Sequence, residues 1–195
     1  MRAAHNGRAP WHSAGMTLPT ASDVLAFWRE AGPTRWFRKD EAFDSAFRTR
    51  FEAAHEAAAT GALDSWTADA EGALALLLLL DQFPRNAYRG TARMFATDAA
   101  AVRVADAAVA SGFDQAVDTA LRPFFYMPFM HSEALADQQR CVALCSPLGN
   151  DTLRFARIHL DAIARFGRFP HRNALLGRDT TPDEQRYLDE GGFAG

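Results

Sequence analysis

Lysine and cysteine are scarce in this sequence. Lys39 is the single lysine among 21 basic residues, and 24 acidic residues give a net charge of -3. That balance provides no electrostatic basis for binding nucleic acid or an anionic membrane. Cys141 and Cys145 stand four positions apart, which matches neither a redox CxxC motif nor half of a common zinc site. We therefore expect two reduced, semi-buried thiols in a cytoplasmic protein.

Long apolar runs are also missing. The apolar run at residues 73–80 falls far short of the ~20 residues that a bilayer requires, and it indicates a helix buried on all sides. Residues 1–16 lack the hydrophobic region of a secretory signal. We expect residues 1–18 to form a disordered tail, and Met16 is a candidate for the natural start.

Strand patterns are almost absent, whereas apolar residues recur at helical spacing along most of the chain. The pattern and its stop signals predict a single all-α domain over residues 19–195 with six to seven helices. The first expected helix begins near Thr20 or Ser22, and the others cover roughly residues 40–60, 66–83, 98–111, 133–146, 150–166 and 182–190.

Several local signals define these helices. Phe43, Phe47 and Phe51 form an apolar stripe, and Pro84 is expected to end the helix of the leucine run. The proline-containing, aromatic residues 121–133 are expected to form a kinked, buried connector, with Ser132 as the N-cap of the next helix. The inner stripe of the helix at 150–166 is predicted to be Phe155, His159, Ala162, Ile163 and Phe166. Thr181, Pro182 and Glu184 predict a capping box at the last helix.

Two polar turns have similar sequences. Phe83-Pro84-Arg85-Asn86-Ala87 follows the leucine run, and Phe169-Pro170-His171-Arg172-Asn173-Ala174 recurs late in the chain with one inserted histidine. The similarity suggests a weak internal repeat. Stacked antiparallel helical hairpins, as in tetratricopeptide-repeat proteins, are a natural architecture for such a repeat.

The polar residues of these turns have two interpretations. They can serve structure alone, with the arginines capping carbonyls or pairing with nearby acids. Alternatively, their arginines outnumber the acids and form a pocket for a small anionic molecule or an acidic peptide. The candidate ligand-binding residues are Asp81, Arg85, Asn86, Arg89, Tyr126, Arg168, His171, Arg172 and Asn173.

Familiar catalytic signatures are absent. The sequence has no GxSxG elbow, Walker A loop or GxGxxG motif, and its histidines lack metal-ligand spacing, so we expect no metal and no cofactor. His131, Glu133 and His159 remain as candidate acid–base groups of an enzyme. Ligand-binding domain, enzyme and purely structural scaffold therefore stay open, and the sequence does not indicate an oligomeric state.

Three motifs together resemble one bacterial family. They are residues 81–91, residues 125–133 and residues 165–173, in that order. The family is catalogued as domain of unknown function 924, and the resemblance extends from about Ser22 to Phe193. It implies an all-helical fold similar to tetratricopeptide-repeat proteins, and it implies no activity because the family has none assigned.

Overall fold

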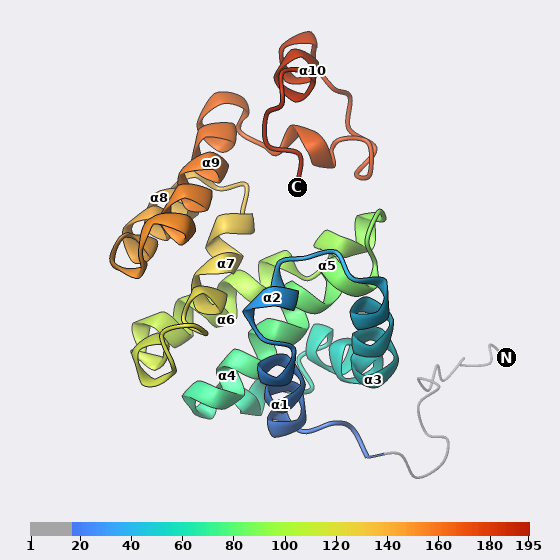
Figure 1. Ribbon diagram of the computed structural model, residues 1–195, viewed down its shortest axis with the longest axis vertical. Coiled ribbons are helices and arrows are strands. Elements are labelled where there is room, and N and C mark those ends of the chain that lie inside the picture. The colour runs from blue at the N-terminus through green and yellow to red at the C-terminus, as the bar shows by residue number, and fades with distance from the viewer. Residues whose placement is uncertain (1–16) are drawn as a thin grey trace, which may run out of the picture.

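The computed structural model describes residues 17–195, and all regular structure in that range is helical (Figure 1). The all-α class is therefore confirmed, although the helical segments outnumber the six to seven expected. Expectations for residues 1–16 lie outside the described residues. The α-helices are α1 (Ala21–Ala31), α2 (Pro33–Trp36), α3 (Glu41–Ala59), α4 (Ala70–Leu77), α5 (Phe83–Ala87), α6 (Asp98–Ala110), α7 (Pro123–His131), α8 (Leu135–Cys145), α9 (Asn150–Phe166) and α10 (Pro182–Asp189).

The helix ends follow from local capping. The Thr20 hydroxyl accepts the Asp23 backbone N–H, and the Asp23 carboxylate accepts the Thr20 N–H in return. Thr181 and Glu184 form the same reciprocal box at α10, as predicted. Gly167 ends α9 in the left-handed region at φ 67°, a conformation that a side chain disfavours.

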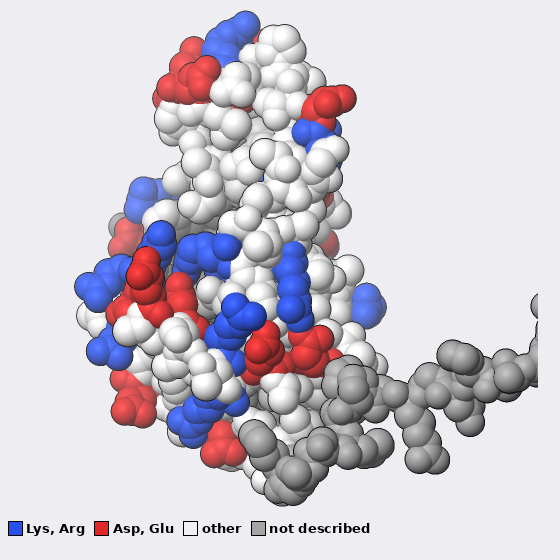
Figure 2. All heavy atoms as spheres, turned by 90° about the vertical axis from the view of Figure 1, so that its right-hand side faces the viewer, with Lys and Arg blue, Asp and Glu red and all other residues white. Residues whose placement is uncertain are grey.

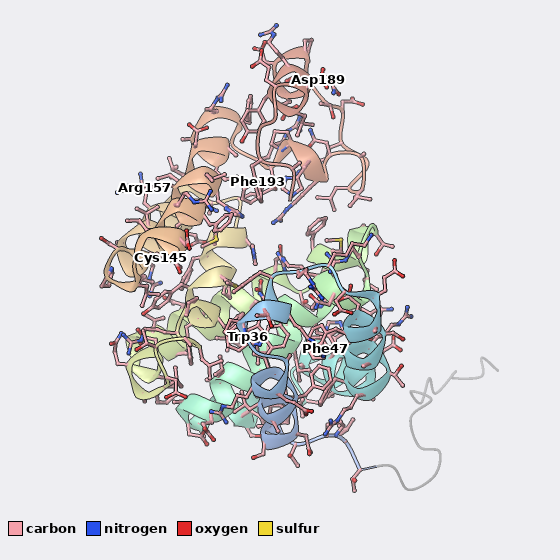
Figure 3. The ribbon with its side chains drawn as sticks, viewed as in Figure 1. Trp36, Phe47, Cys145, Arg157, Asp189 and Phe193 are labelled. Carbon is pink, nitrogen blue, oxygen red and sulfur yellow. The ribbon has the colours of Figure 1, made fainter. Side chains whose placement is uncertain are left out.

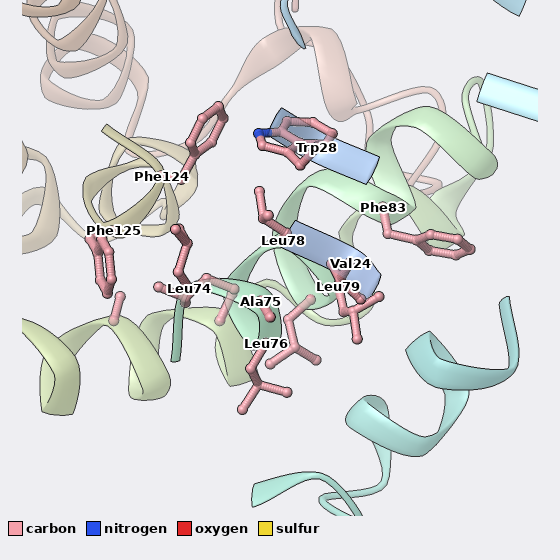
Figure 4. Packing of buried hydrophobic residues seen from close by; sticks show 14 of the residues in the cluster. Val24, Trp28, Leu74, Ala75, Leu76, Leu78, Leu79, Phe83, Phe124 and Phe125 are labelled. Atoms are coloured by element: carbon pink, nitrogen blue, oxygen red, sulfur yellow. The ribbon is translucent and has the colours of Figure 1, made fainter. Parts of the chain in front are cut away.

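The main hydrophobic core surrounds the leucine run. Residues Ala73 through Leu80 are all at most 2% exposed, as expected for a helix buried on all sides. Helices α1 and α6 pack against α4, while the stripe of Phe43, Phe47 and Phe51 on α3 lies inward and α3 packs against α5. Figure 4 shows aromatic and leucine side chains from α1, α4, α5 and α7 meeting in this core.

The helix of the leucine run does not end at Pro84, so that expectation is wrong. Residues Leu78–Gln82 form one π-helical turn (η2), in which the Phe83 N–H donates to the Leu78 carbonyl, and α5 continues directly. A proline inside an α-helix clashes with the carbonyl four residues earlier and lacks an N–H to donate to it. The π turn changes the backbone just before Pro84, and the proline is accommodated within the first turn of α5.

Carbonyls in the π turn are satisfied from other elements. His55 on α3 donates its Nδ1–H to the Leu79 carbonyl over 2.9 Å. The Thr97 hydroxyl, just before α6, donates to the Leu80 carbonyl, which Pro84 cannot engage. Since an unpaired buried carbonyl is costly, these two side chains help to maintain the irregular turn.

The aromatic stretch at residues 121–133 is helical rather than a kinked connector. Pro123 occupies the first turn of α7, where a missing N–H is harmless, and Pro128 lies inside the helix. Ser132 is not the N-cap of α8, because α8 begins at Leu135. The Ser132 hydroxyl instead donates to Asp137 and accepts the Ala134 N–H.

A second, smaller core lies toward the C-terminus, in the upper part of Figure 1. Ala162, Ile163, Phe169 and Tyr187 are its buried members. Helix α9 joins the two cores, because its Ala156 packs in the main core. Phe155 does not face inward as predicted, since it is 45% exposed. The two hydrophobic cores thus adjoin along α9, and polar side chains lie at the junction.

Helices α7, α8 and α9 pack consecutively against one another, as stacked helical hairpins would. Elsewhere the packing skips along the chain, since α1 contacts α4 and α3 contacts α5. The two similar turns also differ in backbone: the first forms α5, whereas the second is a 3-10 turn at Pro170–Arg172. In residues 17–195 no helix combines the length and apolar character needed to cross a membrane.

Candidate functional site

The three sequence motifs meet at the junction of the two cores. His131, the last residue of α7, donates from Nδ1 to Asp81 Oδ1 of the π turn over 2.7 Å. Arg172, from the second turn, donates from Nη2 to the His131 carbonyl over 2.9 Å. The side chain of Glu133 accepts the backbone N–H of Phe169. The three motifs therefore lie next to one another in the structure.

Asp81 is the most enclosed member, with 1% of its surface exposed. Besides His131, its carboxylate accepts a hydrogen bond from Gln82 and lies 3.1 Å from Arg85 Nη1. Burial alone would raise the pKa of this carboxyl, but Arg85 and His131 outweigh that effect and hold the pKa well below its ordinary value. Asp81 is therefore a fixed negative charge.

The hydrogen bond to Asp81 determines the tautomer of His131. A carboxylate can only accept, so Nδ1 carries the proton and Nε2 carries a free lone pair. Burial and the nearby charge of Arg85 lower the pKa of His131, against the opposing effect of Asp81. The imidazole is thus neutral near pH 7 with its side chain 15% exposed. Within residues 17–195 no side chain or backbone group bonds to Nε2.

His159 repeats this arrangement on α9. Its Nδ1–H donates to the Phe155 carbonyl over 2.8 Å, so its Nε2 is also an acceptor. The centroids of the His131 and His159 rings are 6.2 Å apart. Burial, reinforced by His131, lowers the pKa of His159 to about 3. Two neutral imidazoles with defined tautomers consequently lie side by side.

Arg85 and Arg172 share one carboxylate, that of Asp98 at the start of α6. Arg85 Nη1 and Arg172 Nη1 approach its two oxygens to 3.0 and 3.1 Å. The Arg172 guanidinium also lies over the rings of Phe95 and Phe169, 4.4 and 4.6 Å from their centroids. Burial lowers the pKa of Arg172 to about 10, with Asp98 opposing the shift. Its Nε is buried without a hydrogen-bond partner among the described residues.

Glu133 is held in a bidentate pair with Arg178, at 2.8 and 3.0 Å. Arg178 also donates to the Asn173 side chain and to the Phe169 carbonyl. Burial raises the pKa of Glu133, but Arg178 and the Phe169 N–H outweigh it and lower the pKa. Glu133 therefore ties the second turn to the segment between α7 and α8, and both of its oxygens are engaged.

The remaining sequence candidates lie outside this junction or serve local structure. Arg89 pairs with Asp44 at the surface, and Tyr126 donates to buried Asp114 in the main core. Arg168 and Asn173 both bind Glu184, which ties α10 to the second turn. Asn86 is buried on α5.

Two important residues were missed, Asp98 and Arg178. The sequence placed Asp98 only at the start of a predicted helix, and Arg178 lay beyond the third motif. Their long-range partners are what make them part of the junction. We call the set formed by Asp81, Arg85, Asp98, His131, Glu133, His159, Arg172 and Arg178 the polar layer.

The charges of the polar layer balance. Three arginines face three carboxylates, while both of its histidines have lowered pKa values. The expected excess of arginine over acid is therefore not found there. Charges of both signs are likewise interspersed on the molecular face in Figure 2. Among residues 17–195 no group of three or more His, Cys, Asp or Glu is arranged to hold a metal ion.

Comparisons with known proteins identify the family and a similar solved structure but assign no activity. A family model described as "Bacterial protein of unknown function (DUF924)" matches residues 24–192. A solved structure of a "Protein of Unknown Function ATU0120 from Agrobacterium tumefaciens" is 56% identical, with a TM-score of 0.86, over 88% of this chain and 97% of that chain. No curated protein matches the sequence.

Proposed function

We propose that this chain, which belongs to the DUF924 family of bacterial proteins, binds a small polar molecule at the polar layer, where His131 accepts a proton from it. The main observation behind this proposal is the 2.7 Å hydrogen bond from His131 Nδ1 to Asp81, which leaves Nε2 free to accept a proton. An aspartate that holds the tautomer and orientation of a histidine is the arrangement by which imidazoles act as general bases.

Three features support this role. The lowered pKa of His131 keeps the base unprotonated at neutral pH. Its partial exposure allows a ligand to approach, while Asp81 is shielded from solvent. The negative charge of Asp81 would stabilise the imidazolium that forms when Nε2 takes up a proton. Glu133, the other sequence candidate, is engaged by Arg178 and is assigned a structural role.

Hydrolysis of p-nitrophenyl acetate tests the proposal, because this activated ester reports a reactive, unprotonated imidazole. We expect saturable hydrolysis at pH 7 that falls at least about tenfold in His131→Gln and in Asp81→Asn. The matched control is Asp114→Asn, which removes another buried carboxylate away from the site. Equal rates in wild type and His131→Gln would refute a general base at this position.

A second candidate is binding of a small anion or of an acidic peptide by Arg85 and Arg172. The observation that favours it is that two guanidiniums share the Asp98 carboxylate, while Nε of Arg172 has no partner among the described residues. An anion could replace Asp98 in these contacts.

Thermal-shift titration with phosphate, sulfate and citrate tests this second candidate. Binding to the folded state would raise the melting temperature in a saturable way, and Arg85→Ala and Arg172→Ala would abolish the rise. Arg165→Ala, which removes an exposed arginine of α9, is the matched control. The same shift in all four proteins would exclude a site at these two arginines.

A further inference from the structure

The side chain of Phe193 is inserted among three aromatic rings beside the polar layer. Its ring centroid lies 4.0 Å from that of His159, 4.9 Å from that of His171 and 5.9 Å from that of Phe169. Phe193 follows α10, and in Figure 3 its label lies close to α9. We call His159, Phe169 and His171 the ring cage.

Phe193 is attached to the fold by few contacts. Its backbone N–H donates to the Tyr187 hydroxyl over 2.9 Å, and the preceding Gly192 N–H donates to the Tyr187 carbonyl over 2.8 Å. Gly191, with φ 82°, and Gly192 form a two-glycine link between α10 and the ring. Phe169, the phenylalanine of the ring cage, is by contrast fully buried. Phe193 lies beyond the end of α10 at Asp189, so neither of these two hydrogen bonds is part of the helix.

The cage contains polar atoms that a phenylalanine ring cannot satisfy. His159 Nε2 is an acceptor, because its Nδ1 donates to the Phe155 carbonyl. His171 Nδ1 is buried without a hydrogen-bond partner among the described residues. Burial of a polar group without a partner costs free energy, so a ligand that offers a donor would bind here better than a plain benzene ring does.

We propose that the ring cage is a subsite for an aromatic ring that carries a hydroxyl group, and that Phe193 fills this subsite as a displaceable plug. This inference rests on the proposed function, because it names the class of molecule that His131 would act on. The subsite is next to that base, since the rings of His131 and His159 are adjacent. A hydroxyl is favoured over a carboxylate because His159 and His171 have pKa values of about 3 and 4 and are neutral at pH 7, while the guanidinium of Arg172 over the Phe169 ring is already paired with Asp98.

The backbone provides a way to remove the plug without altering the cage. A Cβ at Gly192 would lie 2.5 Å from the Tyr187 carbonyl oxygen and 2.6 Å from its ring, so Gly192→Ala must shift the tail. Phe193→Ala removes the ring itself. Either change should free the subsite, whereas neither alters His159, Phe169 or His171.

Binding of p-cresol, measured by NMR titration, is the test. Wild type should bind it saturably, and a 4-fluorophenylalanine placed at position 193 should change its fluorine shift along the same binding curve. Phe193→Ala and Gly192→Ala should each bind at least about tenfold more tightly, since no plug competes. His159→Phe, which keeps a ring but removes the acceptor, should lower affinity for p-cresol while leaving that for toluene unchanged.

Phe166→Ala is the matched control, because Phe166 packs in the same small core but is not part of the cage. If wild type binds no p-cresol while Phe193→Ala does, the pocket is only a cavity made by mutation and the proposal is wrong. An equal gain in Phe166→Ala, or equal affinities of wild type for p-cresol and toluene, would also overturn it. If ester hydrolysis depends on His131 but wild type binds no p-cresol, the subsite proposal is wrong while the proposed function of His131 still holds.

Discussion

Lowering the pH from 7 to 5 should destabilise this protein through two histidines, the buried His159 and the half-buried His171. Folding lowers the pKa of His159 to about 3 and that of His171 to about 4, mainly by burial and with Arg172 contributing in both cases. The pKa of a histidine in the unfolded chain is about 6.5, so below that pH the unfolded chain binds more protons than the folded protein does. The stabilisation from neutral burial is complete above about pH 6.5 and is lost as the pH falls toward the folded pKa values.

The expected magnitude follows from linkage. Each such histidine lowers the free energy of unfolding by about 1.4 kcal/mol per pH unit below 6.5. Between pH 7 and 5 this amounts to about 2 kcal/mol for each residue, hence about 4 kcal/mol for the pair. His131 and His55, whose pKa values are also lowered, act in the same direction.

Urea denaturation followed by tryptophan fluorescence at several pH values is the assay. The variants His159→Phe and His171→Phe each remove one titrating group, so each should reduce the pH-dependent loss by about 2 kcal/mol, whatever its effect at pH 7. The reasoning would be refuted if wild type lost less than about 1 kcal/mol between pH 7 and 5, or if both variants lost as much as wild type. Either result would show that these imidazoles are not buried and neutral in the folded protein.

Three further predictions concern stability, each measured by urea denaturation at pH 7. Leu78→Ala should cost about 2–5 kcal/mol because Leu78 is fully buried, and a cost of a few tenths would place the leucine run at the surface. Leu80→Asp should lower the free energy of unfolding more than Arg172→Ala does, because it buries an unpaired charge. When Arg172 is lost, Asp98 still has Arg85 as a partner. Normal folding of Leu80→Asp would contradict this prediction. Thr97→Val should cost about 1–3 kcal/mol by leaving the Leu80 carbonyl unpaired, and no loss would show that this hydrogen bond does not stabilise the π turn.

Much of the fold follows from local signals in the sequence. The capping box at Thr181 and the phenylalanine stripe on α3 depend on spacings within single helices, and both were predicted correctly. The burial of the leucine run followed from its composition alone. Proline was the main source of error: Pro84 lies in the first turn of α5, directly after the π turn, and Pro128 lies inside α7.

The candidate site was predictable in position but not in detail. That the arginines of the two polar turns lie close together could be inferred, because polar residues at helix ends lie at the rim of a core. Which residues pair could not be inferred, since Asp98 contacts Arg172 across 74 positions and Arg178 contacts Glu133 across 45. The sequence therefore left open whether the arginines pair with acids, whereas in the structure Arg172 pairs with Asp98 and is 6% exposed.

The π turn links the fold to the candidate site, because it places Asp81 in the polar layer. An extra residue in a helical turn rotates everything that follows by about 100° relative to a regular α-helix. Five consecutive leucines are apolar on every face, so they tolerate such a shift in register without exposing a side chain. Asp81 follows them directly, and its carboxylate is directed to His131 instead of solvent. π turns often occur at functional sites, and this one requires His55 and Thr97 to satisfy its carbonyls. Two other elements thus maintain an irregular turn that directs a buried carboxylate to His131, as the proposed role of the Asp81–His131 pair requires.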